Sequence, residues 1–524
     1  VRVNSELDYT FTGGAITANT LDKSGNGTLT LANANTYRGG TTVSAGTLNL
    51  TENLASAVAV TNASGTLTLS AAAQSVRLAN GATLNAHAGG SIVGNLDAAG
   101  ALLNFYLPAT FAANDTLLDV GGHADIAAST VRAGILGDSS PLVAGDTLIL
   151  VNAASLSGFP TNDLANGIGL QGVSLQYDFT LTTDANRLLA TVKGEDDDGQ
   201  PGNGGNDGAH LNKRTKALSE GFLAGTAFLN QGADFVAERG LLAALETDGS
   251  STLNGFAAIG SGRLKHRTGS HIDVDGYTLV AGLALTGIAN ARTFTLGAFI
   301  EHGEGDYDTA NSFANAASVH GKGDADYTGG GLLAHLTFNE TERGHFYTEA
   351  SARLGKVELD FNTRDLIDVF GRRAAYDSTA RYVSAHAGLG YLGKLSESSR
   401  LKLYGQVLWS RQGADTVRLT TGEPVKFQAV DSQRIRLGAR WNYAVSQNSQ
   451  LTLGAAWEHE FDGEAKASIH GYRLDTPKLS GNTASIETGF TLNPGKPLSV
   501  DVGLQGYAGR REGGAGSFRV NYKF

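Results

Sequence analysis

Four short stretches of the sequence contain residue types that can perform chemistry. GLGYLG, Gly388–Gly393, has the spacing of a dinucleotide-binding loop, while WEHEF at Trp457–Phe461 and the pair His266 and His271 could supply metal ligands, and the consecutive acids 196–198 could attract a cation. The glycine-rich run lies inside a predicted strand rather than at a strand-to-helix turn. The histidines lack metalloprotease spacing, and the acids lack alternate-position ligands and a closing glutamate. No GxSxG elbow occurs. We therefore expect no enzyme, no cofactor and no metal.

Composition narrows the class of protein further. The chain has 524 residues with 70 Gly, 8 Pro, no Cys and no Met, and its formal net charge is −11. This acidity offers no basic field for nucleic acid. The lack of Cys excludes disulfides and suits a chain that is threaded unfolded through an oxidising compartment. The lack of Met predicts a processed chain. No apolar run reaches 18 residues, so no transmembrane helix is expected, although strands of about 9 to 11 residues could still cross a bilayer.

The first hundred residues contain a repeat. GTLTL at Gly27 returns as GTLNL at Gly46, GTLTL at Gly65 and GATLN at Gly81, with spacings of 19, 19 and 16 residues. Each unit is too short to bury its apolar face alone and must stack on its neighbours. Residues 1–100 therefore predict a right-handed parallel β-helix, and extended segments continue with a looser period over 101–193.

A linker and a helix follow. The acidic, Gly-rich and Asn-rich segment 194–209 predicts a flexible boundary. Helical spacing of apolar residues predicts a helix over 211–238, within a pore-spanning region 210–250. The residues that define this helix are Leu218, Gly221, Phe222, Gly225, Leu229 and Gly232. Each internal glycine costs about 1 kcal/mol relative to Ala. Either walls on all sides confine the helix, or it is a surface helix with frayed turns.

Residues 251–524 contain twelve extended segments with alternating apolar and polar residues. Connections after the even-numbered segments are tight, whereas most of the others are long and polar. This is typical of a transmembrane β-barrel with short periplasmic turns and longer external loops, and it places both barrel termini in the periplasm. The segments span 255–267, 273–286, 292–303, 324–338, 344–361, 376–393, 399–412, 430–445, 449–461, 480–492, 497–509 and 515–524.

The last strand shows the alternation to the end of the sequence. Phe518, Val520, Tyr522 and Phe524 are predicted to face lipid, with Arg519 on the polar lumen side. The predicted lumen lining also includes Glu458, Glu460 and Asp501, which are expected to contact the helix.

A resemblance joins these parts. GNGTLTLANANTYRGGTTVSAGTLNL, residues 25–50, resembles the repeat associated with passenger transport in bacterial autotransporters, and the whole order of parts is similar to a classical monomeric autotransporter of the type V secretion class. The resemblance implies an outer-membrane barrel plugged by its helix, and a passenger β-helix at the surface of a Gram-negative cell whose end is capped by 101–193. It also implies that the barrel assembly machinery recognises the terminal aromatic, that periplasmic chaperones and outer-membrane lipid are partners, and that the chain is monomeric.

Three alternatives stay open at this stage. Some family members cleave themselves in the pore by cyclisation of an Asn, and LNKR at Leu211–Arg214 resembles the stretch after that site, with Asn212 as the nearest candidate. The paired Asn expected ahead of it is replaced by Ala209 and His210. A plain porin is a second possibility. In the third, the activity lies in upstream passenger residues that form a β-helix enzyme or an adhesin. An adhesin that binds a host or surface ligand is favoured, because no clustered carboxylates stand out in residues 1–193.

Overall fold

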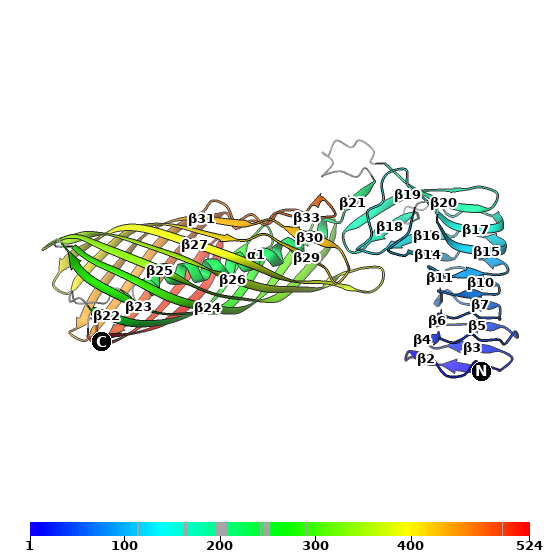
Figure 1. Cartoon of the computed structure of the whole chain (residues 1–524), viewed down its shortest axis with the longest axis horizontal. Helices are drawn as coiled ribbons and strands as arrows, with labels where there is room; N and C mark the ends of the chain where they lie inside the picture. Colours follow the sequence, from blue (N-terminus) through cyan, green and yellow to red (C-terminus); the bar gives the residue numbers. More distant parts are fainter. Residues whose placement is uncertain are drawn as a thin grey trace.

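A computed structural model describes residues 1–112, 115–161, 166–194, 208–241, 244, 252–289, 292–494 and 496–523. Figure 1 shows two parts, a rod of stacked strands at the N-terminal end and a long barrel that encloses one helix. The rungs of the rod stack across the direction of the barrel axis, and the rod lies at the barrel end opposite the C-terminus. Among the described residues, no helix combines the length and hydropathy required to cross a bilayer.

The rod is a parallel β-helix built mainly from two sheets, as the repeat predicts. Thr47 pairs with Thr28 on one side and Thr66 on the other, which matches the 19-residue spacing. The next unit is offset by 17 residues rather than 16. The 16-residue spacing would pair Thr66 with Ala82, but the partner of Thr66 is Thr83. Along each strand the leucines point inward and the threonines outward. The first sheet, sheet A, contains β1 (Arg2–Asn4), β3 (Leu21–Ser24), β5 (Thr41–Val43), β7 (Val58–Val60), β10 (Val76–Leu78), β13 (Leu96–Asp97), β15 (Thr116–Asp125) and β17 (Thr147–Ser157).

The second sheet, sheet B, stacks in the same manner. It contains β2 (Tyr9–Phe11), β4 (Thr28–Leu31), β6 (Gly46–Leu50), β8 (Gly65–Leu69), β11 (Thr83–His87), β14 (Leu102–Leu107), β16 (Thr130–Ile135) and β18 (Ile168–Gln171). The short strands β9 (Ala72–Ala73) and β12 (Ser91–Ile92) pair with each other and lead into β15. Leucines of successive rungs, such as Leu29, Leu48 and Leu67, are fully buried between the sheets. This continuous core is what a single unit could not form.

Antiparallel strands close the end of the β-helix nearest the barrel. β19 (Leu175–Thr183) pairs with β18 and with β20 (Arg187–Val192), and β20 returns along β17. β21 (Ala209–Leu211) adds to β19 as the chain leaves for the barrel. The looser period after residue 100 thus reflects a change from parallel rungs to an antiparallel cap. Residues 195–207 of the predicted linker lie outside the described residues.

The helix begins later than the sequence predicts. Residues 209–211 are strand, Asn212 caps a 3-10 turn over Lys213–Thr215, and α1 spans Lys216–Phe235 before a π-helical turn at Val236–Gly240. Edge pairing with β19 overrides helix propensity at 211. Most side chains of α1 are buried, which excludes the surface-helix alternative. Of the predicted region 210–250, residues 242–243 and 245–250 lie outside the described residues.

Twelve antiparallel strands form the closed barrel, and the first strand pairs with the last. They are β22 (Thr252–Arg267), β23 (His271–Ala289), β24 (Arg292–Phe313), β25 (Ala316–Thr341), β26 (Gly344–Ile367), β27 (Arg373–Ser396), β28 (Ser399–Gln412), β31 (Val430–Ser446), β32 (Ser449–Glu460), β35 (Gly481–Leu492), β36 (Leu498–Gly509) and β37 (Arg511–Lys523). The predicted fold class is confirmed.

The predicted external loops are more ordered than expected. Segments 304–323 and 362–375 are largely strand, because β24 to β27 continue past the apolar belt. There the outward residues become polar, as at Asp306 and Asp308, so the apolar alternation stops although the strand ladder continues. Segments 413–429 and 462–479 hold a small four-stranded sheet of β29 (Asp415–Arg418), β30 (Pro424–Phe427), β33 (Ala467–Ile469) and β34 (Tyr472–Arg473), which we call the external sheet.

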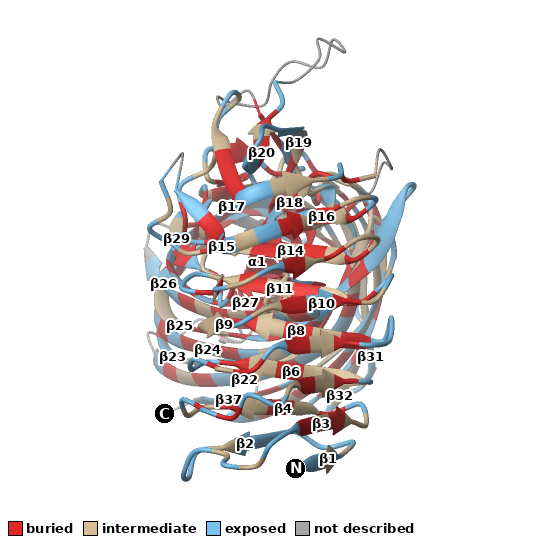
Figure 2. Cartoon of the chain, turned by 90° about the vertical axis from the view of Figure 1, so that its right-hand side faces the viewer, coloured by how far each residue is buried: buried red, intermediate tan, exposed pale blue. Residues whose placement is uncertain are grey.

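Side chains alternate across the barrel wall as a bilayer requires. Apolar residues such as Ile300, Leu354 and Ile486 are about two-thirds exposed on the outside. On β37, Phe518 and Tyr522 are exposed and Val520 is half-buried, whereas Arg519 is buried. Figure 2 looks at the rod from the side away from the barrel and shows buried and intermediate positions alternating along many of its strands. Phe524 lies outside the described residues.

Candidate functional site: the filled pore and the passenger clasp

One side of α1 packs closely against the barrel wall. A Cβ added to Gly225 would lie 2.8 Å from Cδ2 of Leu359, and one added to Gly221 or Gly232 would overlap the ring of Phe361 or the hydroxyl of Tyr327. The three predicted helix glycines are therefore contact points. They let the helix approach large side chains of the wall, and this contact offsets their low helix propensity.

Aromatic rings and hydrogen bonds fix the outer half of the helix. The ring of Phe222 stacks on Phe427 of the external sheet at 4.4 Å, nearly parallel, and Phe228 meets Tyr327 edge-on at 5.3 Å. The Tyr376 hydroxyl donates to the carbonyl of Leu218 at 2.8 Å. Leu229 is also buried. The external sheet thus covers the outer end of the plug.

Charged groups fix the inner half. Asp234 accepts hydrogen bonds from Arg434 and Arg511, both at 2.6 Å, and lies 2.8 Å from Arg436. One turn further on, Glu238 accepts from Arg436. The three arginines come from β31 and β37.

Arg239, in the π-helical turn after α1, is a cation that pairs with acids of the wall. Its guanidinium donates to Asp501 on β36 at 3.0 Å and lies 3.6 Å from Glu487 on β35. Arg519 on β37 lies 3.9 Å from the same Asp501. The helix region therefore contributes both carboxylates and a guanidinium to ion pairs with the wall.

The wall completes the network. Glu458 contacts Arg436 at 2.6 Å and Arg511 at 3.2 Å, and Glu460 lies 3.9 Å from Arg434. Six carboxylates and six guanidiniums, all less than one-tenth exposed, form what we call the lumen network: Asp234, Glu238, Glu458, Glu460, Glu487, Asp501, Arg239, Arg434, Arg436, Arg440, Arg511 and Arg519. The charges balance, as burial in a medium of low dielectric demands.

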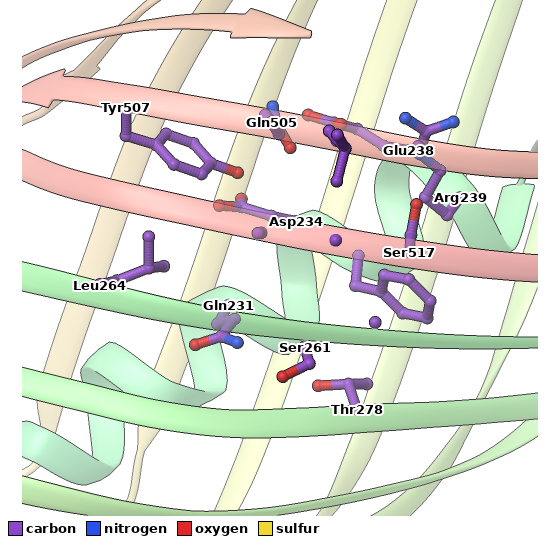
Figure 3. Close-up of a pocket in the computed structure, with 16 residues that line it drawn as sticks. Gln231, Asp234, Glu238, Arg239, Ser261, Leu264, Thr278, Gln505, Tyr507 and Ser517 are labelled. Atoms are coloured by element: carbon purple, nitrogen blue, oxygen red, sulfur yellow. The ribbon is translucent and has the colours of Figure 1, made fainter. Parts of the chain in front are cut away.

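Figure 3 shows the space left between α1 and the part of the wall where the first strand, β22, pairs with the last, β37; we call this part the seam. Gln231, Asp234 and Glu238 of the helix region face Ser261 and Ser517 across a cavity of about 40 Å³. This is room for a few water molecules at most. Between the described residues of the plug and the barrel wall, this gap is therefore narrow.

The structure places all four predicted lumen residues, Glu458, Glu460, Asp501 and Arg519, in the lumen network, where Asp501 contacts Arg239 of the helix region and Glu458 and Glu460 contact arginines of the wall. Sequence reasoning missed the charged residues of the helix region, Asp234, Glu238 and Arg239, and the arginines of β31. The signal was present: RIRLGAR, Arg434–Arg440, places three arginines at even spacing on one strand face.

A second set of contacts joins the β-helix to the external sheet, and we call it the passenger clasp. The buried Glu423 carboxylate accepts from the backbone N–H of Val173 at 2.6 Å, and Nε2 of His470 donates to the carbonyl of Gly137 at 2.9 Å. Phe370, in the hairpin after β26, packs on Tyr106 of β14 with ring centroids 5.2 Å apart. Burial lowers the pKa of the His470 imidazole.

Asn212 lies at the clasp, between cap and helix. Its side-chain amide donates to the carbonyl of Val173 at 2.9 Å, and its Oδ1 accepts from the N–H of Arg214 at 3.1 Å. Its backbone N–H donates to the carbonyl of Ser174 at 2.8 Å. The side chain thus serves as a helix cap and as a tie to the β-helix.

A closed barrel with an apolar outer belt and a polar lumen is a transmembrane barrel of the outer membrane. A barrel whose internal helix leads to an external β-helix is one that presents its own N-terminal domain. The class is a secretion protein with its passenger in the same chain.

Comparison with known proteins identifies the family. Residues 253–505 match the family described as autotransporter beta-domain, and residues 21–50 match the passenger-associated transport repeat. The chain belongs to the autotransporters and is a protein of the bacterial outer membrane. No curated protein sequence matches it significantly.

Three solved structures illustrate the likeness. The beta domain of the Bordetella autotransporter BrkA is 18% identical over 52% of this chain and 99% of its own, with a TM-score of 0.41. The transport unit of AIDA-I from Escherichia coli is 17% identical over 57% and 98%, with a TM-score of 0.39. The translocator domain of NalP from Neisseria meningitidis is 13% identical over 58% and 98%, with a TM-score of 0.43.

Proposed function

We propose that this autotransporter keeps its β-helix attached at the cell surface after export, with α1 as a permanent plug. The observation that carries the proposal is the pair of anchors on either side of the pore. The lumen network holds the inner half of the helix, and Glu423 and His470 hold the cap of the β-helix outside. A freely conducting porin has no use for either anchor.

Protease shaving of intact cells tests this proposal. Full-length chain should persist in the outer membrane without protease, and added protease should remove the β-helix while leaving a barrel whose gel migration changes on heating. A spontaneous, quantitative release of the passenger into the medium would contradict the proposal.

Asn212 is proposed to be a structural cap and not a cleavage site. Cyclisation requires the side-chain amide nitrogen to attack the residue's own carbonyl carbon, but this nitrogen donates to Val173. Asn212→Asp would remove that donor and its tie to Val173, but would keep the helix cap and leave the length of the mature chain unchanged. Mass spectrometry of the purified protein reads out this length directly.

Export is proposed to draw its free energy from folding, since the passenger can add rungs one at a time outside the cell. Each rung buries apolar area worth about 25 cal/mol per Å². A disulfide between Thr47→Cys and Thr66→Cys, which are register partners, would lock two rungs before export. Export should then stall in oxidising medium and recover with a reductant, whereas normal display of the locked passenger would refute the mechanism.

The proposed partners follow from the family. The barrel assembly machinery would recognise the terminal strand with Phe518, Val520, Tyr522 and Phe524, and periplasmic chaperones would hold the chain before insertion. Adhesion or display is the proposed role of the passenger, through a host or surface ligand. Deletion of Phe524 should lower the amount of barrel in the outer membrane. The control is Phe524→Tyr, which keeps the full length and a terminal aromatic residue and should leave this amount unchanged.

A further inference from the structure

One outer face of the β-helix differs chemically from the rest of the passenger. Residues 1–193 contain 13 acidic and 7 basic residues, yet strands β2, β4, β6, β8, β11 and β14 of sheet B contain neither kind. Charged pairs such as Arg2 with Asp22 and Arg77 with Asp97 lie on sheet A. These six strands therefore present an uncharged surface on an acidic domain, and the next strand of sheet B, β16, adds one exposed cation, Arg132, beside Asn104.

Outward residues of sheet B form hydrogen bonds between neighbouring rungs. The side-chain amides of Asn49 and Asn85 each donate to a threonine of the preceding rung at 3.3 Å, and Asn104 donates to Asn85 at 2.9 Å. Rungs of a parallel β-helix repeat every ~4.8 Å. We call this surface the polar ladder; its members are Thr30, Asn49, Thr68, Asn85 and Asn104.

Aromatic rings extend the ladder toward the barrel. The imidazole of His87 stacks on the ring of Tyr106 at 4.3 Å, with an angle of 6° between the planes. Burial lowers the pKa of His87, which favours the neutral imidazole in this stack. Tyr106 in turn contacts Phe370 of the barrel. The ladder is thus continuous with the passenger clasp.

This continuity fixes the direction that the ladder faces. In Figure 1 the strands of sheet B lie on the side of the rod nearer the barrel, and sheet A lies on the far side. Because the barrel axis runs along the membrane normal, sheet B faces the cell and sheet A faces away from it. Molecules of the cell's own surface are therefore what sheet B meets first.

We propose that the polar ladder binds the saccharide chains of outer-leaflet lipopolysaccharide, so that the passenger lies along its own cell surface. Asn and Thr side chains offer both donors and acceptors to sugar hydroxyls, and the paired rings offer an apolar edge. Lipopolysaccharide is anionic through its phosphates, which repel an acidic surface. The uncharged face is the side of this passenger that can approach it.

Site-specific crosslinking in intact cells tests the proposal, and the absence of native Cys makes single-cysteine variants straightforward. Thr68→Cys places a benzophenone maleimide on the ladder, with Thr30→Cys as a second ladder position. Ala59→Cys on β7 of sheet A is the matched control at a comparable height in the rod. Irradiated chains are probed for attached lipopolysaccharide, and heat-dependent migration reports barrel folding.

The expected result is lipopolysaccharide attached at both ladder positions and not at Ala59→Cys. The yield should fall in cells with truncated saccharide chains, and also when Asn85→Asp adds a negative charge to the ladder. Equal crosslinking from both sheets, crosslinking from the ladder to a second copy of the chain, or no attached lipopolysaccharide in folded protein would each overturn the proposal.

Discussion

Replacement of Asp234 by Asn should loosen the plug more than any other single change in the helix. Asp234 is 5% exposed and lies within 2.8 Å of three guanidiniums. Asn keeps the shape but removes the charge, and the arginines then outnumber the carboxylates. Loss of one partner from a buried ion pair costs about 3–5 kcal/mol, which corresponds to an increase of about a hundredfold to several thousandfold in the population with an unseated helix.

Single-channel recording in planar bilayers measures this population as the frequency of open events. Asp308→Asn is the control, because Asp308 is an exposed acid on the outer surface of β24. Combining Asp234→Asn with Arg511→Gln should restore part of the loss, since the second change removes an unpaired buried cation. If Asp234→Asn opens no more often than Asp308→Asn in barrels that migrate as folded, the lumen network does not hold the plug.

Three further outcomes follow from the contacts described above. Gly232→Ala should destabilise the seated helix despite a gain of about 1 kcal/mol in helix propensity, because its Cβ overlaps Tyr327; a higher thermal midpoint of the folded barrel would contradict this. Docking of the β-helix should weaken as pH falls through the window just below 6.5. Burial lowers the pKa of His470 in the docked state, so the undocked state binds more protons there, an effect that Glu423 opposes and Arg418 reinforces. This weakening should broaden the distribution of spin-label distances between Thr68→Cys and Asn315→Cys, the latter on the exposed turn between β24 and β25. The variant His470→Gln should remove the pH dependence of this distribution. Glu423→Ala should broaden the same distance distribution at all pH values, since it deletes the acceptor for Val173; an unchanged distribution would show that the clasp is dispensable.

Much of the fold could be predicted because its patterns are local. The leucine and threonine spacing of the rungs fixes which face is buried, and alternation such as that from Phe518 to Tyr522 fixes the two faces of a barrel strand. Strand ends were harder to place, because polar residues outside the membrane, such as Asp306, hide a strand that continues by backbone pairing alone.

The candidate site could be predicted only in part. Sequence alternation placed Glu458 and Asp501 in the lumen, but no local pattern joins them to Asp234 or Arg239, more than 200 residues away along the chain. The clasp is equally non-local, since Glu423 and Val173 are 250 residues apart. Such contacts depend on how a closed barrel and a β-helix are placed relative to each other, and this placement leaves no periodic signal.

Labelling with a membrane-impermeant maleimide tests the central claim most directly, since a single cysteine can report which side of the membrane each part occupies. Ser64→Cys lies on an exposed turn of the β-helix and Asn448→Cys on the tight turn between β31 and β32. Ser64→Cys should be labelled in intact cells, and Asn448→Cys only after the outer membrane is permeabilised. Labelling of Asn448→Cys in intact cells, or protection of Ser64→Cys, would contradict the account.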